Sequence, residues 1–135
     1  MAYATQADLV ERFGEAELAQ VADLIGNGEA DATVIARALA DADAEIDAAL
    51  LGRYALPLAT VPVLLTRIAC DLARESLYAD HPTKEITDRA ERVRQLLKGI
   101  AAGKMRLDAA AAPQEQSGLG LVEMVSGRRT SPFGG

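Results

Sequence analysis

The sequence predicts an all-α protein: a compact bundle of about five helices, two short and N-terminal and three long, followed by an extended C-terminal arm. Alanine dominates the apolar half of the 135 residues, aromatic residues make up only 4 %, and tryptophan is absent. This composition favours close-packed helices over a β-sandwich. Three long segments also repeat apolar residues at spacings of three and four, as amphipathic helices do. A chain of this length is one domain that can bury a core.

Two short helices are expected at the start of the chain. Thr5-Gln-Ala-Asp8 resembles a capping box that opens the first helix, and Gly14 ends it. The second helix is expected from Glu15 to Leu24, followed by a turn at Gly26-Asn27-Gly28.

The segment from Asp23 to Asp31 shares part of the EF-hand calcium-loop pattern. Ile25 and Val34 occupy positions of that pattern that require oxygen ligands, so we expect an acidic turn without calcium.

The third helix is expected to begin at a cap, Asp31 or Thr33, and to run to about Leu51 before Gly52. Its predicted inner stripe is Ile35, Ala38, Leu39, Ala42, Ile46, Ala49 and Leu50. Its outer surface is expected to carry four carboxylates, Asp41, Asp43, Glu45 and Asp47. Like charges four residues apart destabilise an isolated helix slightly. We interpret the run as a solvated face or, second, as a contact with a neighbouring subunit; metal is disfavoured because no histidine accompanies it.

The stretch from Gly52 to Tyr78 is predicted to organise the fold. Pro57 excludes helix around it, so Tyr54 to Thr60 is expected to be an extended brace. Thr60 is then the expected N-cap of the fourth helix, with Pro62 in its first turn. The apolar stripe is Val61, Leu64, Leu65, Ile68, Leu72 and Tyr78, with Arg67, Asp71, Arg74 and Glu75 between its members. We expect this helix to be the wall against which its neighbours pack.

Thr83 is the expected cap of the last helix, which Gly103 ends. Its inner stripe is Ile86, Ala90, Val93, Leu97 and Ile100, and its outside carries Arg89, Arg92, Arg94 and Lys98. Nothing aromatic accompanies these basic residues, so a solvated face or a protein contact is favoured over nucleic acid.

Charge is unevenly distributed along the chain. The net charge of −6 argues against a protein whose main affinity is for DNA phosphates. Residues 1–52 carry a balance of −9, whereas residues 53–107 carry +4. Two interpretations stay open: copies attract one another head to tail, or the charges neutralise one another within one chain.

No catalytic constellation, metal-ligand spacing or phosphate-binding loop is found, so we expect neither an enzyme nor a cofactor. The single cysteine, Cys70, excludes an internal disulfide and is expected to fill the core. His81, the only histidine, is expected to be inert. No apolar run approaches the ~20 residues of a membrane span, and the N-terminus lacks a signal-peptide pattern.

Residues 108–135 are expected to form an arm separate from the helical domain of residues 1–107. Leu119, Leu121 and Val125 could face one side of a short strand, which would need a partner's sheet to be stable. The candidate partner-binding residues of the arm are Leu119, Leu121, Val122, Met124, Val125, Arg128, Arg129 and Phe133.

Several segments together resemble a family of small Mu-like phage and prophage proteins encoded among the head and tail morphogenesis genes. The most distinctive is Gly52-Arg-Tyr-Ala-Leu-Pro-Leu-Ala-Thr-Val-Pro62, followed by Ile68-Ala-Cys-Asp-Leu-Ala-Arg74. The segments from Met1 to Gly14 and from Ala38 to Asp47 also match, so the resemblance covers about residues 1–107. The tail matches more loosely, through Ser126-Gly-Arg-Arg-Thr-Ser-Pro-Phe133.

By this resemblance the protein is similar to head–tail connectors (adaptors, or head-completion proteins) of tailed phages. The resemblance implies a ring of copies, usually twelve, that docks under the portal protein in the virion neck after assembly in the host cytoplasm. It implies contact with a downstream tail-terminator or stopper protein and with genomic DNA passing through the channel, and no membrane. The four carboxylates from Asp41 to Asp47 could then face the channel. The alternatives are a tail-terminator, stopper or other head-completion protein and, third, a helical DNA-packaging subunit.

Overall fold

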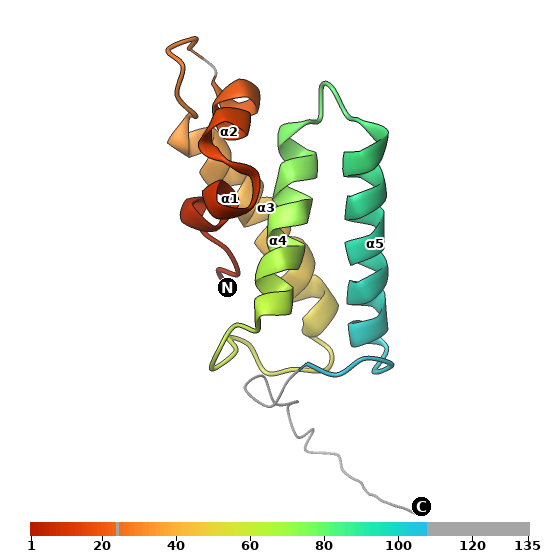
Figure 1. The fold of residues 1–135 in the computed structure, drawn as a ribbon. Coiled ribbons are helices and arrows are strands. Elements are labelled where there is room, and N and C mark those ends of the chain that lie inside the picture. Colours follow the sequence, from red (N-terminus) through yellow and green to blue (C-terminus); the bar gives the residue numbers. More distant parts are fainter. Residues whose placement is uncertain (24, 108–135) are drawn as a thin grey trace, which may run out of the picture.

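The computed structural model describes residues 1–23 and 25–107 and contains five helices within them (Figure 1). They are α1 (Gln6–Phe13), α2 (Glu15–Ala22), α3 (Ala32–Leu50), α4 (Val63–Leu77) and α5 (Lys84–Ala101). Two short helices precede three long ones, so the predicted all-α bundle is confirmed. The expected arm and its candidate residues, Leu119, Leu121, Val122, Met124, Val125, Arg128, Arg129 and Phe133, lie outside the described residues.

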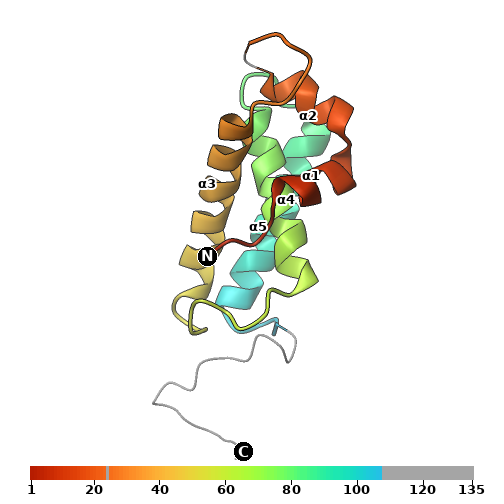
Figure 2. The ribbon, with the colours of Figure 1, turned by 90° about the vertical axis from the view of Figure 1, so that its left-hand side faces the viewer.

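Helix α4 is the centre of the bundle. It packs against α3 and α5 along its length and also contacts α1, and Figures 1 and 2 show these neighbours on different sides of it. The side chains of Leu65, Ile68, Ala69, Cys70 and Ala73 have no exposed surface. Alanine and cysteine at these positions let neighbouring helices approach closely, as tight interior packing requires. The prediction that this helix is the wall of the bundle is confirmed.

Local capping signals are realised at three helix starts. Thr5 and Asp8 form the reciprocal box: the Asp8 N–H donates to Thr5 Oγ1 at 3.2 Å, and the Thr5 N–H donates to Asp8 Oδ2 at 2.8 Å. Asp31 Oδ1 accepts from the Thr33 N–H at 2.8 Å, and Thr83 Oγ1 accepts from the Ile86 N–H at 3.2 Å. Each cap satisfies backbone donors that have no partner within their helix.

The acidic turn after α2 is closed by its own aspartate. Helix α2 ends at Ala22, two residues earlier than expected. Asp23 accepts hydrogen bonds from the backbone N–H groups of Gly26 and Gly28, at 2.8 and 2.7 Å, and these bonds lower the pKa of its carboxyl. The carboxylate therefore stabilises the turn itself.

The start of α4 was predicted wrongly. The helix begins at Val63 after Pro62, which stays extended, and no side chain caps it; Thr60 is exposed. The preceding segment packs Tyr54 and Leu58 into the core. Residues 54–60 form a run of bends, so the expected extended brace is wrong. With these two side chains buried, the chain becomes helical only after Pro62, later than the local signals indicate.

The inner stripe of α5 is buried as predicted, at Ile86, Ala90, Val93, Leu97 and Ile100. None of the helices in the described ranges 1–23 and 25–107 is both long enough and apolar enough to cross a membrane.

Burial raises the pKa of the Cys70 thiol to about 11, so little thiolate is present at about pH 8. We expect the native protein to react with a disulfide reagent such as DTNB far more slowly than the protein in guanidinium chloride. Equal rates under the two conditions would show that Cys70 is not in a closed core.

Candidate functional site

The four carboxylates of α3 lie on two flanks of the helix and serve different contacts. Asp43 and Asp47 lie beside the N-terminal segment, whereas Asp41 and Glu45 line a groove shared with α4 and α5. Residues four apart share a flank of a helix and residues two apart do not, which explains the division. The expected fully solvated face is therefore not found, because three of the four side chains are only partly exposed.

The first flank holds the start of the chain. Asp47 accepts hydrogen bonds from the Met1 amino group at 2.9 Å and from the Tyr3 hydroxyl at 2.6 Å, while Asp43 accepts from the Tyr3 N–H at 3.0 Å. The Thr66 hydroxyl of α4 donates to the Tyr3 carbonyl at 2.8 Å. Figure 2 shows this segment crossing between the two helices. These two carboxylates are thus occupied within the chain.

Burial of the first flank changes the acidity of its groups. Desolvation raises the pKa of the Tyr3 hydroxyl, with its hydrogen bond to Asp47 acting in the same direction, and desolvation also raises the pKa of Asp43. The hydrogen bond to Asp47 raises the pKa of the Met1 amino group. Sequence reasoning missed Tyr3 as a structural residue, because its partner lies 44 positions away.

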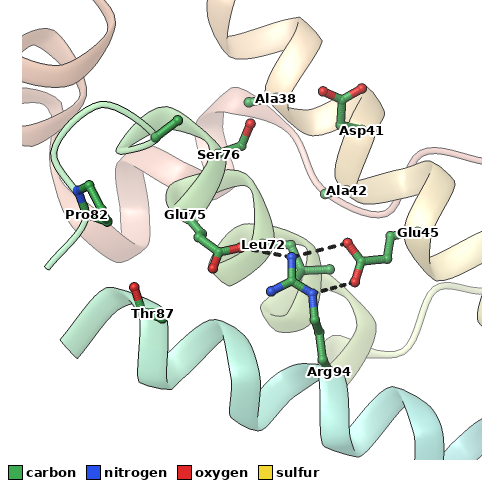
Figure 3. A pocket seen from close by; sticks show the side chains of 11 residues that line it. Ala38, Asp41, Ala42, Glu45, Leu72, Glu75, Ser76, Pro82, Thr87 and Arg94 are labelled. Carbon is green, nitrogen blue, oxygen red and sulfur yellow. Dashed lines mark hydrogen bonds and ion pairs between the residues drawn. The ribbon is translucent and has the colours of Figure 1, made fainter. Parts of the chain in front are cut away.

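The second flank forms one wall of a groove of about 420 Å³ between α3, α4 and α5 (Figure 3). We call it the acidic groove. It is lined by Ala38, Asp41, Ala42, Glu45, Leu72, Glu75, Ser76, Ala79, Pro82, Thr87 and Arg94. Small side chains on α3 and α4 leave the space open, since nothing bulky projects from Ala38, Ala42 or Ser76.

Arg94 joins the three long helices across this groove. Its Nε lies 2.7 Å from Glu45 Oε2 on α3, and its Nη2 lies 2.8 Å from Glu75 Oε1 on α4. Hydrogen bonds to Glu45 and Glu75 raise the already high pKa of the guanidinium. Asp41 is exposed and makes no ion pair with any described residue. Three carboxylates against one guanidinium leave the acidic groove negative.

The other basic residues of α5 lie elsewhere. Arg92 and Lys98 are exposed, and Arg89 is half-buried. The expected basic outer surface is therefore divided, because Arg94 turns into the groove. For the Arg94–Glu45 pair, neutralisation within the chain is the interpretation that the structure supports.

Asp71 on α4 is a buried carboxylate that the sequence pattern placed among polar, outward residues. Only 6 % of it is exposed. Burial raises the pKa of this carboxyl, while the positive charges of Arg89, Arg67, Arg12 and Arg74 oppose the rise. Helix α4 has neighbours on three sides, which is why a position opposite its apolar stripe is also covered.

Arg74, one turn from Asp71, is similarly enclosed. Its Nε lies 2.7 Å from Glu17 Oε2, and its guanidinium stacks on the Phe13 ring at 4.3 Å from the centroid. This pair fixes α2 to α4, and the stacking is a favourable cation–π contact. In the described part of the chain, no group of three or more His, Cys, Asp or Glu residues could hold a metal ion, and His81 is exposed.

Comparison with known proteins places the chain in a family. The family model described as "Bacteriophage Mu, Gp36" matches residues 3–126. The chain belongs to the bacteriophage Mu Gp36 family. The Mu-like phage membership that the sequence motifs indicated is thereby confirmed.

Two relatives illustrate the Mu Gp36 family. The chain is 35 % identical over 105 residues to the Mu-like prophage FluMu protein gp36 of Haemophilus influenzae, covering 78 % of this chain and 74 % of that protein. It is 37 % identical over 109 residues to gene product J of Escherichia phage Mu, covering 77 % of this chain and 74 % of that protein. Both relatives are phage or prophage proteins, so the chain is a phage protein.

Replacing Asp71 by asparagine should stabilise the protein at about pH 7, because a carboxyl whose pKa is raised on folding is held in an unfavourable charged form. That cost is absent below the ordinary pKa of the group and grows as pH rises through the folded pKa. The stability difference between Asp71→Asn and wild type, measured by urea unfolding, should therefore shrink toward acid pH. A difference that grows on acidification would contradict the burial of an unfavourable charge.

Replacing Arg94 by methionine should destabilise the protein by about 1 kcal/mol, because Glu45 and Glu75 would be left facing each other. The estimate is small for a doubly paired arginine because its side chain is 35 % exposed and solvent screens the pair. The matched control is Lys84→Met, which removes an exposed ion pair with Asp88 on the same helix and should cost less than about 0.5 kcal/mol. Equal losses in urea unfolding would show that Arg94 does not join the helices.

Proposed function

We propose that the protein is a structural component of a tailed-phage neck: a head–tail connector that forms a ring under the portal, extends the DNA channel and joins head to tail. The observation that carries the proposal is membership of the Mu Gp36 family over residues 3–126, and the resemblance of residues 1–107 to small Mu-like phage proteins implies similarity to head–tail connectors. The ring would contain several copies of this chain, usually twelve in such connectors. Its other partners would be the portal protein and a downstream stopper or tail-terminator protein.

A structural role rather than an enzymatic one fits the chemistry of the described side chains. The guanidinium of Arg94 is held by two carboxylates, and the Cys70 thiol is buried with a raised pKa. His81 is exposed on the α4–α5 turn, with no hydrogen bond from its ring to any described group. We infer no reaction and no cofactor from these groups. The polar residues of the described surface are better suited to protein contacts.

The contacts of α3 limit which of the four carboxylates from Asp41 to Asp47 can face the DNA channel. Asp43 and Asp47 bind the N-terminal segment, so these two carboxylates do not face a channel in this proposal. Asp41 and Glu45 line the acidic groove between α3, α4 and α5, and a groove that contacts a neighbouring copy cannot also face passing DNA. A DNA-packaging role is less well supported, because Arg94 is already paired and Arg89 lies near Asp71.

Capture by the portal ring of the same phage tests the proposal. We expect the immobilised portal to retain the full-length protein, and the variant Leu119→Ser/Leu121→Ser/Val125→Ser to lose most of that capture, because the apolar residues of the arm would make the contact. Lys84→Ala, altered at an exposed position of α5, is the control and should be retained normally. Failure of the portal to capture the wild-type protein would contradict the connector role. Strong duplex-DNA binding at physiological salt would instead favour packaging.

A further inference from the structure

We propose that the acidic groove binds an arginine-bearing surface of a second copy of this chain, head to tail. We call that surface the arginine face; it comprises Arg12 of α1, Arg67 of α4, and Arg89 and Arg92 of α5. The inference deepens the proposed function by naming the two surfaces through which copies meet. It rests on the proposed function only where it says that these contacts close into a ring. The contact itself can be tested on the protein alone.

The acidic groove has the chemistry to accept arginine side chains. Its floor includes the apolar side chains of Leu72, Ala38 and Ala42, and its walls carry Asp41, Glu45 and Glu75 (Figure 3). An arginine offers an apolar stem with a planar cationic head, which matches an apolar floor with carboxylates at the rim. Arg94 occupies part of the wall, yet Asp41 has no ion-pair partner among the described residues.

The arginine face gathers around Asp71 on another side of the bundle. Arg89, Arg67 and Arg12 all act electrostatically on the Asp71 carboxylate, and they come from three different helices. Arg92 follows Arg89 by three residues, so the two are neighbours on the surface of α5. Arg12, Arg67 and Arg92 are exposed.

The acidic residues near this face are already engaged: Asp71 lies within it, and Asp88, four residues before Arg92 on α5, pairs with Lys84. Asp8 and Glu11 lie near Arg12 at a hollow beside α1, and Asp8 is also engaged in the cap of that helix. Arg67 on α4 and Arg92 on α5 form no ion pair with any described residue. The positive charge available to a partner is therefore concentrated at Arg67 and Arg92.

The two surfaces cannot satisfy each other within one chain. An α-helix turns about 100° per residue, so Arg89 and Arg94, five positions apart, point about 140° away from each other around α5. Arg94 belongs to the acidic groove beside α3, whereas Arg89 acts electrostatically on Asp71 of α4. Figure 1 shows α4 between α1 and α5 with α3 behind it. Two different, complementary surfaces on one chain make a heterologous contact, which closes into a ring if the rotation between copies permits.

Charge exchange between copies tests the contact in the full-length protein. Self-association is measured by sedimentation for wild type, for Asp41→Lys, and for Arg67→Glu/Arg92→Glu; all three positions are exposed, and circular dichroism checks that each variant folds. We expect each variant alone to associate at least about tenfold more weakly than wild type, because like charges then meet. An equimolar mixture of Asp41→Lys with Arg67→Glu/Arg92→Glu should associate again, in complexes that contain both variants. Alternating copies of the two variants place opposite charges at every contact. The control Lys104→Glu, at an exposed position beyond the end of α5, should associate like wild type.

Three results would overturn the inference. The first is a mixture that associates no better than its components. The second is a wild-type protein that stays monomeric at about millimolar concentration, where even weak contacts are populated. The third is association that persists in Arg67→Glu/Arg92→Glu but is lost both in Asp41→Lys and in Arg128→Glu/Arg129→Glu. That pattern would show that the C-terminal segment, and not the arginine face, binds the acidic groove. Portal capture distinguishes the two proposals. Capture by the portal without self-association would support the connector role and contradict this contact, whereas self-association without capture would do the reverse.

Discussion

Burial of α4 on three sides is the constraint on which the rest of the structure depends. Leu65, Ile68 and Ala73 are completely removed from solvent, and removing apolar surface from water is the main favourable term in folding. The helix can be enclosed in this way because alanine and cysteine occupy several of its positions, which lets α1, α3 and α5 all reach it. Every other feature of the bundle is fitted around that central helix.

Enclosure of α4 has consequences for its polar side chains. Asp71, Arg74 and Glu75 cannot all point to open water, so neighbouring helices must supply opposite charges. Glu17 of α2 pairs with Arg74, and Arg94 of α5 pairs with Glu75. Burial reduces the acidity of Asp71, and the surrounding arginine charges oppose that effect without cancelling it. Packing thus places charge at two separate locations, the acidic groove and the arginine face.

The predictions that succeeded depend on neighbouring residues in the chain. The cap at Thr83 and the buried stripe from Ile86 to Ile100 were predicted because a cap is decided within three residues and a helix repeats every 3.6. The predictions that failed depend on distant partners. Helix α4 starts late because Leu58 is buried by the tertiary fold, and no local pattern reports that burial.

The candidate site was predictable only in part. The carboxylates of α3 and the basic residues of α5 were recognised, and their spacing already separates Asp41 and Glu45 from Asp43 and Asp47. Which pair meets the N-terminus and which meets Arg94 follows from the placement of helices, not from spacing. A partial signal for Arg94 was present, because it directly follows Val93 of the buried stripe and so lies at the edge of the packed face.

Native-state hydrogen exchange measures the central constraint most directly. If α4 is the enclosed centre of the bundle, the amides from Ile68 to Leu72 should exchange only through global unfolding, at the highest free energy in the molecule, while α1 opens at a lower one. Exchange of the α4 amides through local opening, at a lower free energy than those of α3 and α5, would contradict the account.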